Sequence, residues 1–169
     1  PAQTVVDFGC GGGFLLEKLA VKRKAGIEIN EAARVEALRK GIFVVDKIEH
    51  IPDRFADILL SNHALEHVEN PLQCLKDLRS KLKLQGLAIF VVPHQGPHEC
   101  YIENDVNDHL YTWNPLTLGN LFKAAGFDII NVDTIQHQWP PDYLQVYKQK
   151  GEKAFHKICR QFAISNDNY

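Results

Sequence analysis

An aspartate followed by closely spaced glycines is the most chemically informative pattern in this sequence. Asp7 lies in an apolar run, and Gly9, Gly11 and Gly13 follow it at alternate positions. Glycine lets the backbone adopt a positive φ and lets a ligand approach without a Cβ atom in the way. The pattern therefore predicts a buried strand, a glycine turn and a helix N-terminus, which form a cradle for a nucleotide-type ligand at the carboxyl edge of a parallel sheet.

The charge of Asp7 restricts which ligand this cradle binds. A dinucleotide fingerprint has the pattern G-x-G-x-x-G, and Phe14 stands where the third glycine is required. A carboxylate in a partly dry cleft repels a pyrophosphate and attracts a cationic group. S-adenosylmethionine carries an ammonium and a sulfonium and has no phosphate. The sequence D-x-G-x-G-x-G resembles the first motif of the class I S-adenosylmethionine-dependent methyltransferases.

The resemblance extends through an ordered series of motifs between residues 5 and 135. Gly26–Asn30 resembles the family's second strand, and Glu28 lies about 20 residues after Asp7, where a ribose-binding carboxylate is expected. Val44–Asp46 resembles the third strand, whose final aspartate meets the adenine. The resemblance implies the following cofactor-binding residues: Asp7, Phe8, Gly9, Gly11, Gly13, Glu28, Ile29, Asp46, Asn62 and His63.

Each of these residues also has a purely structural interpretation. Asp7 could be a turn-former that bonds nearby backbone amides, and Glu28 could cap the helix that begins after Asn30. Asp46 could be a solvated strand end. Asn62 and His63 follow the fourth expected strand, where they could contact either the methionine part of the cofactor or the acceptor.

Residues 94–113 form a long connection whose hydrophobic residues follow neither a helical nor a strand period. In a compact domain such a connection indicates a functional or disordered loop. His109 is the candidate general base, since an imidazole suits the deprotonation of a hydroxyl. The alternative is a structural histidine that fixes the loop. Candidate acceptor-binding residues in this segment are His94, Tyr101, Tyr111 and Trp113.

No metal site is predicted. His94, His98 and Cys100 are possible ligands, but polar loop residues without a metal are the preferred interpretation, because short ligand-like spacings arise often by chance. Glu66 and His67, in a segment that resembles the family's "LEHV" sequence, are assigned no chemistry.

Short apolar runs alternate with amphipathic stretches, which favours a doubly wound, mostly parallel α/β sheet with helices on both faces, Rossmann-like. Asn70-Pro71 and Asn114-Pro115 are typical helix starts. We expect strands at 4–8, 25–29, 43–46, 56–61, 86–92 and 127–136, and helices at 13–21, 31–40, 71–83 and 115–125. Compared with the family, the N-terminal helix and the last antiparallel strand are expected to be missing.

A chain of 169 residues predicts one domain. Within it we expect a cofactor-binding core at 4–92, an acceptor-side loop at 94–113, a final helix and strand at 114–136, and a C-terminal helical segment at 141–163, interrupted by Gly151.

The composition is that of an ordinary globular protein, with 45% hydrophobic and 24% charged residues. The formal net charge of −2 gives no electrostatic case for nucleic acid or an anionic membrane as partner. Scattered cysteines without a C-x-x-C pair fit a reducing cytoplasm. The sequence thus predicts a methyltransferase that moves a methyl group from S-adenosylmethionine to a small-molecule acceptor, preferably oxygen, and releases S-adenosylhomocysteine. The alternatives are a dinucleotide-binding NAD(P) oxidoreductase and a non-catalytic cofactor-binding module.

Overall fold

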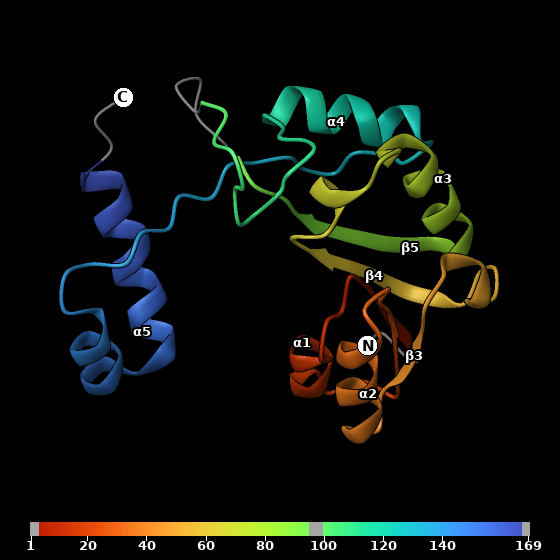
Figure 1. Ribbon diagram of the computed structural model, residues 1–169, viewed down its shortest axis with the longest axis horizontal. Coiled ribbons are helices and arrows are strands. Elements are labelled where there is room, and N and C mark those ends of the chain that lie inside the picture. Colours follow the sequence, from red (N-terminus) through yellow and green to blue (C-terminus); the bar gives the residue numbers. More distant parts are fainter. Residues whose placement is uncertain (1–3, 95–99, 167–169) are drawn as a thin grey trace. The chain divides into compact units, whose positions relative to one another are not determined.

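The computed structural model describes residues 4–94 and 100–166. The chain divides into two compact units, residues 1–132 and residues 133–169 (Figure 1), and each is described by itself. The expectation of one domain over residues 1–169 stays a prediction.

The first unit is built on a five-stranded parallel sheet with the strand order β3-β2-β1-β4-β5. The order reverses between β1 and β4, which pair so that Asp7 lies opposite Leu60 and Phe8 opposite Ser61. In such sheets the ligand lies outside the carboxyl ends of the strands, at this switch point. The strands are β1 (Thr4–Phe8), β2 (Arg23–Ile27), β3 (Phe43–Val45), β4 (Ala56–Asn62) and β5 (Leu82–Val91).

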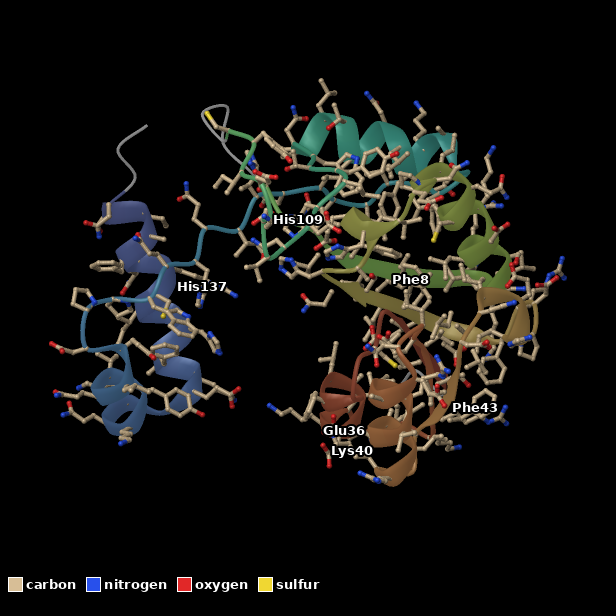
Figure 2. All side chains as sticks on the ribbon, viewed as in Figure 1. Phe8, Glu36, Lys40, Phe43, His109 and His137 are labelled. Atoms are coloured by element: carbon tan, nitrogen blue, oxygen red, sulfur yellow. The ribbon has the colours of Figure 1, made fainter. Side chains whose placement is uncertain are left out.

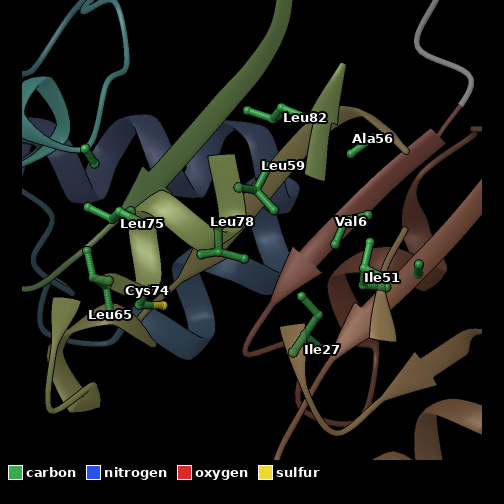
Figure 3. Packing of buried hydrophobic residues seen from close by; sticks show 12 residues of the cluster. Val6, Ile27, Ile51, Ala56, Leu59, Leu65, Cys74, Leu75, Leu78 and Leu82 are labelled. Atoms are coloured by element: carbon green, nitrogen blue, oxygen red, sulfur yellow. The ribbon is translucent and has the colours of Figure 1, made fainter. Parts of the chain in front are cut away.

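Helices cover both faces of this sheet, as predicted. Figure 1 shows α1 and α2 on one side and α3 and α4 on the other. Successive residues of β1 point to opposite faces: Val5 packs with Leu16 and Ala37, whereas Val6 belongs to the larger cluster with Leu75 (Figure 3). The helices are α1 (Phe14–Lys18), α2 (Glu31–Arg39), α3 (Pro71–Lys81) and α4 (Pro115–Ala124), with short 3-10 turns η1 (Ile48–His50) and η2 (Leu65–His67).

Asparagine caps fix the starts of three of these helices. The side chain of Asn30 accepts from the Ala33 amide at the start of α2, and that of Asn70 accepts from the Gln73 amide at the start of α3. Asn114 and Thr117 form a reciprocal capping box at α4. The helix starts predicted at Asn70-Pro71 and Asn114-Pro115 are confirmed.

The strand predicted at 127–136 is wrong, because none of these residues is assigned to a strand. Their β-branched side chains indicated a strand, but β propensity depends on cross-strand pairs, and residues 127–136 pair with no strand of the described sheet. Ile130 is 83% exposed and Ile135 is 67% exposed.

Other boundaries move by a few residues. The helix predicted at 13–21 is limited to Phe14–Lys18, and the strand predicted at 25–29 begins and ends two residues earlier. The helix predicted at 71–83 ends at Lys81, where β5 follows directly.

The second unit contains one long helix, α5 (Tyr143–Ser165), which agrees with the helical segment predicted at 141–163. Gly151 interrupts it with a non-helical backbone at φ 74° and ψ 167°, as expected. Phe155, Cys159 and Ala163 form its buried side. His137, labelled in Figure 2, lies 3.1 Å from His156, measured from Nε2 to Nδ1. Among the helices of residues 4–94 and 100–166, none combines the length and the apolar character that crossing a membrane requires.

Candidate cofactor and acceptor site

The glycine turn joins the end of β1 to the end of β2. The amides of Gly9 and Cys10 both donate to the carbonyl oxygen of Ile27, at 2.8 and 3.2 Å. Gly9 has a φ of 73°, and a Cβ atom on it would overlap the Cβ of Ala64. A Cβ on Gly11, in contrast, would meet nothing within 4 Å. The turn therefore needs glycine at position 9 for packing and leaves open space at position 11.

Asp7 lies beneath this turn and is only 3% exposed. Its Oδ1 atom is buried and has no hydrogen-bond partner in the described structure. Burial, and to a lesser degree the nearby charge of Glu28, raise the pKa of Asp7 to about 7. A buried carboxylate oxygen without a donor is costly. The site thus fits a ligand that brings a cationic hydrogen-bond donor to this atom.

Glu28 holds the turn together in this structure. Its Oε2 accepts from the Gly11 amide at 2.9 Å, and its Oε1 accepts from the Asn30 amide at 2.8 Å. Glu28 is not the helix cap that was its structural alternative, because Asn30 caps α2 and Glu28 binds the amide of that capping residue. A ribose role is compatible with these two bonds, since each carboxylate oxygen can accept a second hydrogen bond. The neighbouring Ile29 is 86% exposed.

Asp46 lies at the end of β3 and pairs with His50, with 2.8 Å between Oδ1 and Nδ1. This hydrogen bond holds the pKa of Asp46 below its ordinary value. Its contact with adenine stays a prediction.

The carboxyl end of β4 presents a buried hydroxyl and two exposed side chains. Ser61 is 2% exposed, and its Oγ has no partner in the described structure. Asn62 and His63 are exposed. His63 has a φ of 53°, unusual for a residue other than glycine. Its amide donates to the carbonyl oxygen of Val91 at 2.9 Å, which ties this turn to β5.

Glu66 is the main residue that the sequence analysis missed. Its side chain is fully buried, and its two oxygens form no hydrogen bond in the described structure. The nearest imidazole nitrogens are His63 Nδ1 at 3.2 Å and His109 Nε2 at 4.0 Å, both measured to Oε1. An acidic residue directly after the apolar Ala64-Leu65 is the signal that could have identified it.

His109 lies on the segment between β5 and α4 (Figure 2), and this segment is attached to η2 through the main chain. The amides of Leu110 and Tyr111 both donate to the Glu66 carbonyl oxygen, at 2.9 and 3.3 Å. The rings of His109 and His67 meet edge to face, with centroids 5.1 Å apart. Ligand-type atoms of Glu66, His67 and His109 lie within 4.8 Å of one another. The structure thus brings the predicted base next to a buried carboxylate.

Two of the three aromatic residues predicted to bind the acceptor, Tyr111 and Trp113, also anchor the segment. Tyr111 and Trp113 stack with centroids 5.7 Å apart, and the Tyr111 hydroxyl donates to the Glu69 carbonyl oxygen at 2.9 Å. Trp113 packs against the larger core cluster. Tyr101 is 91% exposed, and His94 is exposed as well. His98 lies outside the described residues. The acceptor-binding roles of His94, Tyr101, Tyr111 and Trp113 stay predictions.

Comparison with known proteins identifies the family. Residues 1–132 match the profile of a family described as "Methyltransferase domain". A ubiquinone biosynthesis O-methyltransferase of Pseudomonas syringae pv. tomato is 30% identical in an alignment covering 56% of this chain and 46% of the relative. One with the same name from Erwinia tasmaniensis is 33% identical over 52% of this chain and 41% of its own. The chain thus spans about half the length of these curated relatives.

Solved structures share the fold. A methyltransferase from Archaeoglobus fulgidus, described as SAM-dependent, superposes with a TM-score of 0.66 at 21% identity, over 96% of this chain and 77% of its own. One from Thermotoga maritima, described as SAM-dependent and a possible histamine N-methyltransferase, gives a TM-score of 0.64 at 24% identity, over 76% and 65%.

Proposed function

Since this chain belongs to the class I S-adenosylmethionine-dependent methyltransferases, we propose that it transfers a methyl group to a hydroxyl of a small-molecule acceptor. The observation that carries the proposal is the buried carboxyl of Asp7 under the glycine turn, whose Oδ1 has no hydrogen-bond partner among the described residues.

The residues of the cradle fit the cofactor. Among residues 4–94 and 100–166 no donor reaches the Oδ1 atom of Asp7, and the ammonium of S-adenosylmethionine would supply one. The open space at Gly11 leaves room for the methionine portion. Glu28, already fixed by two backbone amides, presents its remaining lone pairs to the ribose hydroxyls.

When bound, the cofactor supplies an electrophilic methyl group on a good leaving group. The chain's own residues have three tasks: to orient the acceptor, to exclude water, and to take the proton from the attacking hydroxyl. The imidazoles beside Glu66 are the groups placed for the last task, and His109 is the one the sequence predicts.

Two observations support oxygen as the acceptor atom. The Pseudomonas and Erwinia relatives are named for O-methylation. A cluster of imidazoles suits an acceptor that must lose a proton as it is methylated, since histidine titrates near neutral pH.

The proposal is tested by calorimetric titration with S-adenosylhomocysteine, followed by a turnover assay with phenol, catechol and small hydroxyquinones as acceptors. We expect one bound cofactor per chain and release of S-adenosylhomocysteine with at least one phenolic acceptor. Failure to bind the cofactor refutes the proposed function. Binding without turnover of any hydroxyl, amine or thiol acceptor identifies a non-catalytic module.

A further inference from the structure

The side-chain cluster at the end of β4 contains a charge that the proposed function does not explain. Glu66 is completely buried, yet no hydrogen bond from the described residues reaches its carboxylate. Burying a carboxylate in this state is costly, and proteins retain such groups where they serve a reaction or a ligand. The Nδ1 atom of His63 lies 3.2 Å from Oε1 of Glu66.

His63 is held in an unfavourable conformation at this point. A φ of 53° is strained for a residue with a Cβ, and such strain concentrates at functional sites. The His63 amide is bonded to the Val91 carbonyl oxygen, which keeps the backbone in place. The imidazole is half exposed, so one edge of the ring is open to an acceptor while the other faces Glu66.

The position of this pair relative to the cofactor cradle is also favourable. His63 directly precedes Ala64, whose Cβ packs so closely on Gly9 that no side chain fits between them. The His63–Glu66 turn is therefore in contact with the glycine turn that the methyl donor would occupy.

We propose that His63 and Glu66 form the proton-accepting pair of this site, with His63 as the general base and Glu66 as its positioning residue. This role rests on the proposed methyl transfer to oxygen. With Nδ1 only 3.2 Å from Oε1 of Glu66, the neutral imidazole would carry its proton on Nδ1, facing the carboxylate, which leaves the lone pair of Nε2 free. As the new C–O bond forms, the acceptor's O–H bond breaks and its proton moves to Nε2. The electron pair of the broken C–S bond stays on sulfur, and the imidazolium returns its proton to water at its exposed edge.

The first test needs no acceptor. Long-range 1H–15N correlation spectra of 15N-labelled protein report which ring nitrogen of each neutral histidine carries the proton, and the His63→Gly variant assigns the signal. We expect His63 to carry its proton on Nδ1, and Glu66→Gln to shift that signal. A His63 protonated on Nε2 and bare at Nδ1 overturns the proposal.

The second test separates function from folding. His63→Gly removes the imidazole and relieves the positive φ, so the variant should unfold at the same or a higher temperature. Its kcat with the most active phenolic acceptor should fall by 100-fold or more, within the usual contribution of a general base, and added imidazole should restore part of it. The proposal places His63 on the acceptor side and not in the cofactor-binding role that the resemblance implies, so S-adenosylhomocysteine affinity should not change in His63→Gly. This readout distinguishes failure here from failure of the proposed function.

Arg54→Gly is the matched control, because Arg54 has a φ of 54° in the loop before β4. It should keep full kcat. Loss of less than threefold in kcat for His63→Gly overturns the proposal. So does a purified protein that carries a divalent cation and loses it in Glu66→Gln, since Glu66 would then be a metal ligand.

Discussion

Cofactor affinity should depend steeply on pH below neutrality because of Asp7. Burial raises the pKa of its carboxyl to about 7, so at pH 6 about one molecule in ten has this group ionised. A cationic ammonium binds the ionised form. Affinity for S-adenosylhomocysteine should therefore fall about tenfold for each pH unit below 7 and level off above about pH 7.5.

The same shift predicts how the ligand-free protein responds to pH. The ordinary pKa of 3.8 is raised to about 7 in the folded chain, so folding favours the protonated form. The stabilisation from this proton is fully present below the ordinary value and is lost as pH rises through about 7. Three pKa units correspond to about 4 kcal/mol, which is an upper limit on that loss. Bound cofactor should recover part of it.

Calorimetry with S-adenosylhomocysteine between pH 5.5 and 7.5 tests this reasoning, because the amine of that ligand stays charged throughout. Below pH 7 binding should release protons, measured by comparing buffers of different ionisation enthalpy. Asp7→Asn should bind weakly and lose most of the pH slope, and its ligand-free form should be more stable than the wild type at pH 8. Asp53→Asn is the control, since Asp53 is an exposed carboxylate bonded to Lys81. An unchanged slope in Asp7→Asn would falsify the assignment of the slope to this carboxylate.

Three further substitutions test the packing and the turn. Gly9→Ala should weaken S-adenosylhomocysteine binding at least tenfold by pushing the turn away from Ala64, and adding Ala64→Gly should restore part of the affinity, although the positive φ leaves a residual cost. Equal affinities of the single and double variants in the same titration would contradict this steric reasoning. Glu28→Gln should keep the fold but weaken binding, because one amide oxygen replaces two acceptors. An unchanged S-adenosylhomocysteine dissociation constant would limit Glu28 to holding the amides of Gly11 and Asn30. Leu75→Ala, in the larger core cluster, should lower the free energy of unfolding in urea by about 2–5 kcal/mol, whereas a loss below 1 kcal/mol would mean that α3 packs more loosely than described.

The candidate cofactor-binding residues could be predicted from the sequence because they lie close to one another along the chain. Asp7 and the alternate glycines lie within one turn, and the spacing to Glu28 follows from one βαβ unit. The family match decides for this interpretation and against the dinucleotide-binding oxidoreductase that Phe14 already disfavoured. The parallel strands, the helices on both faces of the sheet and the asparagine caps at Asn70 and Asn114 were predictable for the same reason. Each of them follows from a pattern within a short stretch of sequence.

The rest depends on contacts between distant residues. Glu66 meets His109 across 43 positions of sequence, and no local pattern encodes that contact. Residues 127–136 show the reverse case. Their local pattern predicted a strand, but no strand of the described sheet pairs with them. Sequence reasoning also treated Glu28 as a ligand for ribose or a helix cap, whereas in the structure it ties the glycine turn to the amide of Asn30, and its ribose contact stays a prediction.

The attachment of the acceptor-side segment to η2 has a consequence for how new specificities can arise. Two amides of this segment share one carbonyl oxygen of Glu66, so the anchoring depends on main-chain atoms that every amino acid except proline provides. Side chains around His109 can therefore be exchanged while the loop keeps its path. We expect that a methyltransferase with such an anchored loop can change its acceptor through a few substitutions. Its sequence then identifies the methyl donor far more clearly than the acceptor.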